Sequence, residues 1–413
     1  MASDEEAVEL TAQCLCKAQS ITTSVPTSSL PLQASYCHCT SCRHVTGGMY
    51  SSCVAWPGSP AAVRALSLRG YVFSQKLTIL FCGTCSSPMF WRERHPEKER
   101  KGKEEEETFE AFTGVLSNNA IPNMIQVKDH IFVGDTLDGG AAIWLRHLMK
   151  DKSGAPVPCY RSWRHDSEFV DPDAMAAASE AKMKQVPVPD EIPVHCRCKG
   201  VNLILHRGIA DYSAKEPSQL PFFVDPSTYK LIAGFDACHS CRTSAGIDVM
   251  NWTFTLLKHI DYAPSSSSSD TTFSGSCFPS NTLDLKAAVS SPDRDPRLSH
   301  LAYYASSDDV QRYFCSRCSA SVFYAIDSRP NMVDLGSGLL DAPDGARAES
   351  VLVWTLGLMI WPEDVKGGWR EELVDSIKRN SEDWRIKNGI PVSWARKLRE
   401  ERTAKNAVEA AQG

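Results

Sequence analysis

Short apolar runs separated by turn-forming residues dominate the chain, a pattern typical of β-strands. The runs SLRGYVF (67–73), LTILF (77–81), IQVKDHIFV (125–133) and VNLILH (201–206) are rich in β-branched and aromatic residues. Apolar residues at helical spacing stand out in the C-terminal segment GWREELVDSIKR, at Trp369, Leu373 and Ile377. We therefore predict a mainly β protein with a C-terminal helix that packs on its own domain.

The chain contains two copies of one sequence pattern, and the order of their cysteines identifies them. A Cys-x-Cys pair opens each copy, a compact triplet follows, and a Cys-x-x-Cys pair with an apolar tail closes it. The first copy holds Cys14 and Cys16, then Cys37, Cys39 and Cys42, then Cys82 and Cys85. The second copy holds Cys196 and Cys198, then Asp236, Cys238 and Cys241, then Cys315 and Cys318. A period this long predicts two tandem compact all-β domains built from short antiparallel sheets.

Breaks in the pattern set the expected boundaries. We predict a first domain at 8–149, a linker at 150–191, a second domain at 192–365 and a helical tail at 366–413. The linker contains AMAAASEAKMK, which predicts a short helix. A charge run at 92–107 interrupts the first copy and a Ser-rich stretch at 265–276 interrupts the second. Both are expected to be solvated insertions.

Composition narrows the setting in which these cysteines act. The net charge of -6 offers no general attraction to nucleic acid or to anionic membranes. No apolar run reaches the roughly 20 residues of a membrane helix, and the acidic start MASDEEAVEL is unlike a secretory signal. We expect a cytoplasmic protein, with the nucleus as the alternative. Sixteen cysteines in such a reducing compartment favour metal binding or chemistry over disulfides.

The outer cysteine pairs predict closed zinc sites. Two pairs that converge from distant sequence supply four thiolates, the set that structural Zn²⁺ takes in a tetrahedron. The expected ligands are Cys14, Cys16, Cys82 and Cys85 for one ion, and Cys196, Cys198, Cys315 and Cys318 for another. Two disulfides per domain or an iron–sulfur cluster are the alternatives that the sequence leaves open.

The inner triplets predict a different kind of site. Cys37, Cys39 and Cys42 have no recurrent fourth partner, so a zinc ion held by them keeps one position free for a ligand. His38 is the alternative fourth ligand, which would close the site. In the second copy Asp236 replaces the first cysteine. Because a carboxylate is a harder and shorter ligand, we expect a fourth zinc held by Asp236, Cys238 and Cys241 to be weak or absent.

Taken together, the CxC pair, the CHCxxCR triplet followed by glycine, and the FCxxC pair resemble the glutathione-dependent formaldehyde-activating enzyme family, which also includes centromere protein V. The resemblance covers roughly 8–148 and 192–361. It implies a compact all-β fold around a structural zinc and a second zinc, held by three cysteines, that is associated with glutathione binding. It also implies carbon–sulfur lyase chemistry on S-(hydroxymethyl)glutathione, with Cys37, Cys39 and Cys42 as the catalytic set.

Several residues beside the inner triplet are further candidates. Arg43 can offset the thiolate charge or pair with a substrate carboxylate, and a solvated loop arginine is the equal alternative. Gly47 fits a turn with positive φ or a close approach of backbone to ligand. His44 is a candidate acid or base, with a surface histidine as the alternative. Ser86 and Ser319 stand where the family usually has glycine.

The sequence thus supports more than one function. The first hypothesis is a zinc-dependent carbon–sulfur lyase acting on a small thiol such as glutathione and an aldehyde such as formaldehyde, with chemistry in the first domain and a degenerate second domain. The second is a non-catalytic zinc module that binds protein or nucleic acid. The third is a zinc-stapled scaffold. Zinc counting decides much of this: two closed sites alone predict two ions per chain, one live inner site predicts three, and a working Asp236 site predicts four. The oligomeric state stays open.

Overall fold

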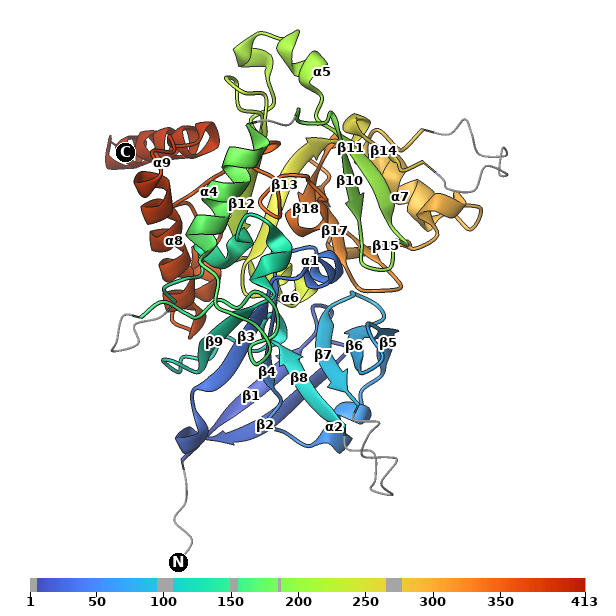
Figure 1. Cartoon of the computed structure of the whole chain (residues 1–413). Helices are drawn as coiled ribbons and strands as arrows, with labels where there is room; N and C mark the ends of the chain where they lie inside the picture. Colours follow the sequence, from blue (N-terminus) through green and yellow to red (C-terminus); the bar gives the residue numbers. More distant parts are fainter. Residues whose placement is uncertain (1–5, 95–106, 149–154, 185–186, 265–276, 413) are drawn as a thin grey trace, which may run out of the picture.

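The protein is described here by a computed structural model covering residues 6–94, 107–148, 155–184, 187–264 and 277–412. Figure 1 shows two β-rich halves that follow one another along the chain, with the two C-terminal helices against one flank. Most of the two expected insertions, 95–106 and 265–276, lies outside the described residues. The prediction of a mainly β protein with two tandem halves and a helical C-terminus is confirmed.

The first half consists of one large sheet and a hairpin. Its seven-stranded sheet has the order β5-β6-β7-β8-β4-β3-β9, and β1 pairs with β2 beside it. The strands are β1 (Ala7–Gln13), β2 (Ser20–Pro26), β3 (Leu32–Cys37), β4 (Ser51–Ala55), β5 (Leu68–Val72), β6 (Leu77–Cys82), β7 (Pro88–Glu93), β8 (Thr108–Phe112) and β9 (Ile125–Ile131). The short helices are α1 (Thr40–Thr46) and α2 (Pro60–Arg64).

The second half repeats this plan with one additional strand, β14, beside the hairpin. Its seven-stranded sheet has the order β15-β16-β17-β18-β13-β12-β19, and a smaller sheet joins β10, β11 and β14. The strands are β10 (Glu191–His195), β11 (Asn202–His206), β12 (Leu231–Asp236), β13 (Met250–Leu256), β14 (Ile260–Tyr262), β15 (Leu301–Ser307), β16 (Val310–Cys315), β17 (Ser321–Ile326), β18 (Met332–Gly336) and β19 (Leu352–Trp354). The helices are α5 (Ile209–Ser213), α6 (His239–Ala245) and α7 (Thr282–Ser290).

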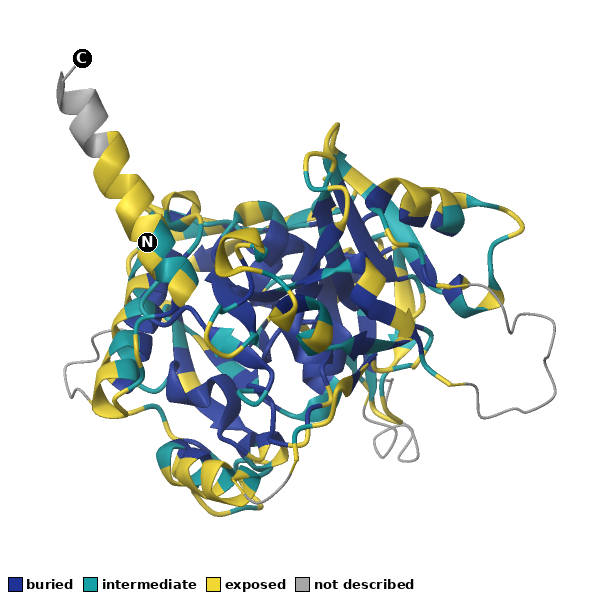
Figure 2. Cartoon of the chain, turned by 90° about the horizontal axis from the view of Figure 1, so that it is seen from above, coloured by how far each residue is buried: buried dark blue, intermediate teal, exposed yellow. Residues whose placement is uncertain are grey.

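The pairing within these sheets departs from the expectation at one edge. All strand pairs are antiparallel except the edge pairs β3–β9 and β12–β19, which run parallel. The four predicted apolar runs became β5, β6, β9 and β11. Most of their apolar side chains enter a hydrophobic core that spans both halves, whereas Val72 is 70% exposed. Figure 2 shows the buried residues gathered in the interior of the molecule. Five tryptophans are buried in this core, namely Trp56, Trp91, Trp144, Trp252 and Trp354, whereas Trp361 is 51% exposed.

The halves meet through equivalent backbone segments. The amide of Gly338 donates to the carbonyl of Gly47 over 3.0 Å, and the amide of Gly114 donates to the carbonyl of Gly246 over 3.1 Å. Gly47 and Gly246 end α1 and α6 with φ of 81° and 74°. A Cβ on Gly47 would lie 2.1 Å from the carbonyl oxygen of Ser321. Glycine is therefore required there both by the helix end and by the neighbouring half.

Ser86 and Ser319, which stand where the family usually has glycine, keep a backbone conformation that favours glycine. Both adopt a φ of 66°, the left-handed region that glycine enters without strain. The Ser86 hydroxyl donates to the carbonyl of Ser319 over 3.0 Å. The two closing loops of the cysteine pairs therefore face each other across the contact between the halves.

The segment between the halves is more ordered than a simple linker. The amide of His130 donates to the carbonyl of Pro158 and the amide of Tyr160 donates to the carbonyl of His130, over 2.9 and 2.8 Å. This stretch therefore extends the sheet beyond the edge strand β9. The predicted short helix is α4 (Pro172–Met183), which Asp171 caps.

The C-terminal helices are α8 (Arg370–Lys387) and α9 (Trp394–Gln412). The expectation that the first of them packs on its own domain was too narrow. Arg370 at the start of α8 forms a fully buried ion pair with Asp248 of the second half, over 2.9 Å. It also donates to the carbonyl of Leu116 in the first half over 3.0 Å, and Asp248 accepts from the Tyr36 hydroxyl over 3.0 Å. The helix therefore joins both halves.

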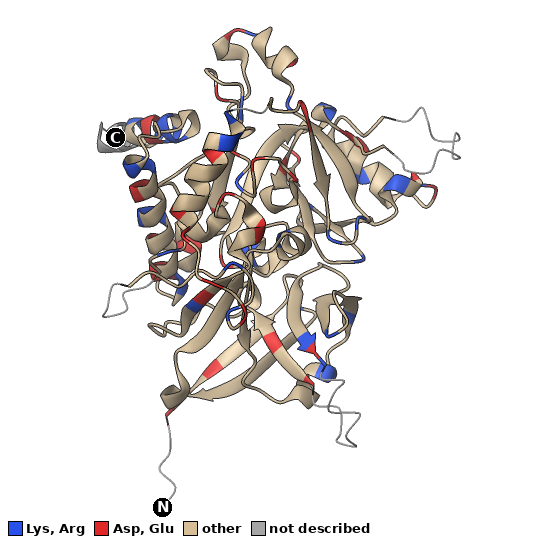
Figure 3. Cartoon of the chain, in the orientation of Figure 1, with Lys and Arg blue, Asp and Glu red and all other residues tan. Residues whose placement is uncertain are grey.

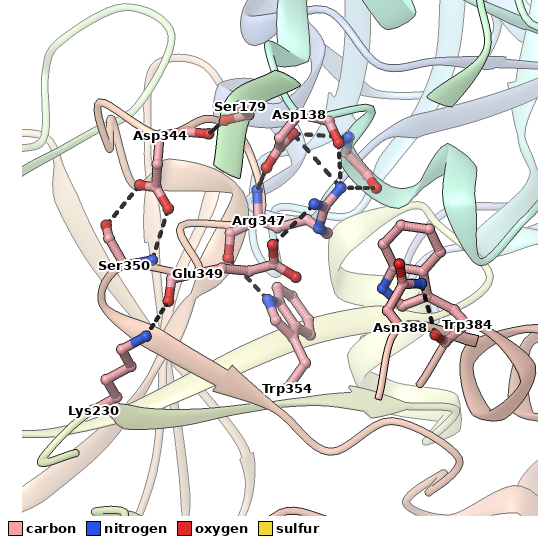
Figure 4. A network of polar contacts seen from close by, with 11 residues as sticks. Asp138, Ser179, Lys230, Asp344, Arg347, Glu349, Ser350, Trp354, Trp384 and Asn388 are labelled. Carbon is pink, nitrogen blue, oxygen red and sulfur yellow. Dashed lines mark hydrogen bonds and ion pairs between the residues drawn. The ribbon is translucent and has the colours of Figure 1, made fainter. Parts of the chain in front are cut away.

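A second buried arginine makes a similar link (Figure 4). The backbone amide of Arg347 donates to Asp138 of the first half over 2.7 Å, and its guanidinium pairs with Glu349 over 2.9 Å. The Trp354 indole donates to the carbonyl of Arg347 over 2.8 Å. Since a buried charge that loses its partner is costly, these links hold the halves in one arrangement.

Candidate metal centres

The outer cysteines of the first half converge on one point. Cys14 and Cys16 follow β1, Cys82 ends β6 and Cys85 lies in the next turn. The sulfur of Cys16 lies 3.5 Å from that of Cys14 and 3.6 Å from that of Cys82. Four sulfurs about 2.3 Å from one zinc ion lie about 3.8 Å apart, so this spacing fits a tetrahedral site. A disulfide requires about 2 Å.

The second half builds the same tetrad. The sulfur of Cys198 lies 3.5 Å from that of Cys196 and 3.5 Å from that of Cys315. The amide of Val201 donates to the sulfur of Cys196 over 3.3 Å, which stabilises a thiolate. All sixteen cysteines of the chain are free thiols. The disulfide alternative therefore does not fit, and both tetrads could hold a metal ion.

Each tetrad borders on the opposite half. Burial and the charges of Cys318 and Cys198 raise the pKa of Tyr71, on β5 of the first half, to about 12. Burial and the charges of Cys16 and Cys85 likewise raise the pKa of Tyr304, the equivalent residue on β15. Each half thus contributes a tyrosine whose pKa responds to the cysteines of the other half.

The first inner cluster joins a strand end to a short helix. Cys37 is the last residue of β3, Cys39 caps α1, and Cys42 lies in its first turn. The three sulfurs lie within 4.8 Å of one another, and the amide of Cys42 donates to the sulfur of Cys39 over 3.3 Å. The sequence pattern predicts no helix here, whereas the structure forms one from Thr40. The helix fixes the spacing of the last two sulfurs.

The three inner thiols share their protons unequally. Hydrogen bonds from Cys37 and Cys42 hold the pKa of Cys39 at about 3, despite its burial. The hydrogen bonds with Cys39 and Cys42, followed by burial, raise the pKa of Cys37 well above its usual value. A metal ion that binds all three sulfurs must therefore displace protons, and its affinity must fall at low pH.

His38 does not complete this cluster. Its Nε2 lies 3.0 Å from Nδ1 of His130, and the Nε2 of His130 lies 2.9 Å from the carbonyl of Leu145. Because a carbonyl only accepts, His130 carries its proton on Nε2 and His38 donates to it. The only other nitrogen of His38, Nδ1, is buried without a hydrogen-bond partner. Among the described residues no fourth His, Cys, Asp or Glu joins the three sulfurs.

Arg43 is buried rather than solvated, so the loop-arginine alternative was wrong. It is 4% exposed and donates to the Thr40 hydroxyl over 3.4 Å. Two other nitrogens, Nε and Nη1, are buried without a hydrogen-bond partner. Burial lowers the pKa of Arg43, and the charges of Asp138 and Cys39 oppose that shift. A cation with unused donors therefore lies beside the inner thiols.

Two further residues of the first half could not be assigned from the sequence. Asp135 accepts from the amide of Thr40, and burial followed by the charge of Cys39 raises its pKa. Its equivalent Asp364 accepts from the amide of His239 over 2.7 Å. His130 lies 88 residues or more from the inner cysteines, and only the parallel β3–β9 pair brings it to His38. No sequence motif predicts the contact of Asp135 with Thr40 or that of His130 with His38.

The candidates His44 and Gly47 lie between the halves. His44 is 1% exposed, and its Nδ1 lies 3.0 Å from Nδ1 of His195 in the second half. It is therefore neither a surface histidine nor a neighbour of the inner sulfurs by any described contact. Gly47 makes the backbone contact with Gly338 described above. Its expected contact with a bound thiol stays a prediction.

The second inner cluster has the same backbone but different surroundings. Asp236, Cys238 and Cys241 offer ligand atoms within 4.8 Å of one another. A guanidinium lies against them: both terminal nitrogens of Arg312 are 3.7 Å from the sulfur of Cys241. At the equivalent place on β6 of the first half stands Ile79, which is fully buried.

A cleft of about 620 Å³ lies elsewhere. It is lined by residues of the 120–123 loop and the start of α8, among them Trp369, Glu371 and Arg379. None of the four cysteine clusters contributes to it.

Comparison with known proteins gives a family match for the first half of the chain. Residues 9–134 match the family model described as glutathione-dependent formaldehyde-activating enzyme. The match spans β1 to β9 and includes the outer tetrad and the inner triplet of the first half. No curated protein and no solved structure matches the chain.

Proposed function

We propose that the first half catalyses glutathione-dependent activation of formaldehyde, as a carbon–sulfur lyase. The reaction joins the sulfur of a small thiol to an aldehyde carbon, and in reverse cleaves an S-(hydroxymethyl)glutathione type of adduct. The observation that supports it is the inner triplet: three converging sulfurs with no fourth ligand among the described residues, inside the stretch that matches the family.

The proposal assigns three metal ions. Two zinc ions occupy the outer tetrads and hold distant strands together. The third is held by Cys37, Cys39 and Cys42. When bound there, zinc supplies a Lewis-acid position that favours the thiolate form of a thiol. The proposal assigns no zinc ion to the Asp236 cluster, where a carboxylate replaces a thiolate.

The chain's own residues provide charge and rigidity around that position. Arg43 offers Nε and Nη1, two buried donors without partners, to a carboxylate of the thiol co-substrate. The buried hydrogen bond between His38 and His130 fixes the backbone between Cys37 and Cys39. Asp135 caps α1 and holds the loop after β9 against the cluster. Gly47 stays in the proposed binding region as the end of the same helix.

The test compares single cysteine variants of the full chain. Hemithioacetal formation from glutathione and formaldehyde is followed by NMR for the wild type and for Cys39→Ser. We expect at least about a hundredfold loss for Cys39→Ser, because the reacting sulfur is no longer positioned. Cys53→Ser is the matched control, since the Cys53 thiol donates a hydrogen bond to Glu110 and belongs to none of the four clusters. Equal rates at equal zinc content would remove the proposal.

The alternative of a nucleic-acid module gains nothing from the charge distribution. Figure 3 shows both signs interspersed, for example along α8 and α9, rather than a basic stripe. No helix in the described part of the chain is long and apolar enough to cross a bilayer. We propose a reducing compartment such as the cytosol, because the cysteines are free thiols.

A further inference from the structure

We propose that Cys238 and Cys241 form a metal-free dithiol that exchanges with low-molecular-weight disulfides of the glutathione disulfide class. This inference does not depend on the chemistry proposed for the first half. It concerns the inner cluster of the second half, in which one of three cysteines has been replaced by Asp236.

The first observation is the arrangement of the two sulfurs. Cys238 precedes α6 and Cys241 lies in its first turn, a Cys-x-x-Cys spacing, with the sulfurs within 4.8 Å of each other. This spacing at a helix start permits closure of a disulfide with small movements. Asp236 cannot take part in such a bond. Its carboxylate accepts from the amide of Cys238 over 2.8 Å and so fixes the turn.

The second observation is a fixed positive charge where a metal ion would need to bind. Arg312 is 5% exposed, and its two terminal nitrogens lie 3.7 Å from the sulfur of Cys241. It also donates to Ser240 over 2.8 Å and to Ser306 over 3.0 Å. These contacts prevent the guanidinium from moving aside. A divalent cation at the same sulfur would be repelled at short range in a buried environment.

The third observation is the unequal access to the two sulfurs. Cys238 is partly exposed, whereas Cys241 is 3% exposed. Cys238 is therefore the sulfur that a small disulfide can reach. The arrangement assigns an order to the exchange, with an accessible attacking sulfur and a shielded resolving sulfur.

The exchange balances without any other reactant. The thiolate of Cys238 attacks one sulfur of the small disulfide, a mixed disulfide forms, and one small thiolate leaves and takes up a proton. The thiolate of Cys241 then attacks the sulfur of Cys238 and releases the second small thiol. The chain has lost two electrons and two protons as a disulfide, and the small disulfide has become two thiols. Arg312 stabilises negative charge on Cys241 for the second step.

The experiment uses the full-length, zinc-loaded protein in glutathione buffers of increasing disulfide content. Remaining thiols are alkylated, and peptide mass spectrometry identifies the bonds formed. We expect a Cys238–Cys241 disulfide with no loss of zinc. Cys241→Ser should stop at a mixed disulfide of Cys238 with glutathione. Arg312→Ile, which copies Ile79, should slow closure by about tenfold, because a charge-assisted bond is lost.

The matched variant is Asp236→Cys, which restores three cysteines. It should bind one more zinc ion per chain than the wild type when Arg312 is also replaced by isoleucine, and it should then resist the disulfide. Four zinc ions in the wild type with Cys238 and Cys241 protected from glutathione disulfide would overturn the proposal. Oxidation of the first-half triplet at the same rate would also overturn it, since the reaction would then be unspecific.

Discussion

The two halves share the order of their seven-stranded sheets, their closed cysteine tetrads and the aspartate that caps the inner helix, yet they differ around the inner cluster. Four pairs of equivalent positions carry the difference. They are Cys37 and Asp236, His38 and Ala237, His130 and Met359, and Ile79 and Arg312. A thiolate, a histidine pair and an isoleucine in the first half thus correspond to a carboxylate, two apolar residues and a guanidinium in the second.

This difference shows which parts of the fold are the same in both halves and which parts vary. The tetrads lie against the opposite half, through Tyr71 and Tyr304, so a change in either one disturbs both halves. The polar side chains that differ around the inner clusters make their described hydrogen bonds within their own half. These residues can therefore differ while the backbone contacts at Gly47 and Gly246 still join the halves.

The largest effect should come from the tetrads. Cys14→Ser and Cys196→Ser should each release one zinc ion and lower the free energy of unfolding by more than about 5 kcal/mol, because structural zinc binding is coupled to folding. Since each tetrad borders the other half, both variants should unfold in one transition. Calorimetry with elemental analysis checks this, and two separate transitions would contradict the interlocked arrangement.

The buried link through α8 should come next. Arg370→Met leaves Asp248 as an unpaired charge between the halves, so we expect a loss of about 3–5 kcal/mol in urea unfolding. The control is Glu180→Gln, which breaks the exposed pair with Lys184 and should change stability by less than about 1 kcal/mol. Similar losses for the two variants would show that α8 does not join the halves.

The glycines at the helix ends should give a graded series. Gly47→Ala places a Cβ 2.1 Å from the Ser321 carbonyl oxygen, and we expect a loss of about 2–4 kcal/mol. Gly246→Ala meets the Pro88 side chain at 2.6 Å and should cost less. Gly367→Ala, with a φ of 73° and open space around it, should cost only about 1 kcal/mol from backbone strain. Equal losses in chemical denaturation would rule out steric contact between the halves as the cause.

The smallest effect should be the pH dependence that His130 contributes in the first half. Burial lowers the pKa of His130 to about 4, below its unfolded value, so the stability it confers is present above about pH 6.5 and is lost as the pH falls toward 4. Between pH 7 and 5 this loss should be roughly 1–2 kcal/mol. His130→Met, which copies Met359, should remove that part of the pH dependence. An unchanged slope in the variant would contradict this assignment.

Much of the fold could be predicted because its signals are local. Cysteine spacing and alternating apolar runs mark the strands and tetrads, and the pattern around Trp369, Leu373 and Ile377 marks α8. The inner helices were missed because Cys39 to Gly47 has no apolar periodicity and its helix ends after two turns. Short helices of this kind are stabilised by tertiary contacts, such as the cap from Asp135.

The contacts that distinguish the two inner clusters could not be predicted in the same way. Arg312 reaches Cys241 across 71 positions of sequence, and Arg370 reaches Asp248 across 122. A lone charged residue inside a strand pattern says only that it needs a partner, not which one. Strand register supplies the answer, and register is a property of the folded sheet.

The crossed backbone contacts at Gly47 and Gly246 have an evolutionary consequence. If two identical chains were joined through such a contact, every substitution would occur twice, once on each side of the axis. Fusion of both copies into one polypeptide removes that constraint. One copy can then keep an ancestral reaction while its twin acquires another, and the shared joint preserves the architecture of both.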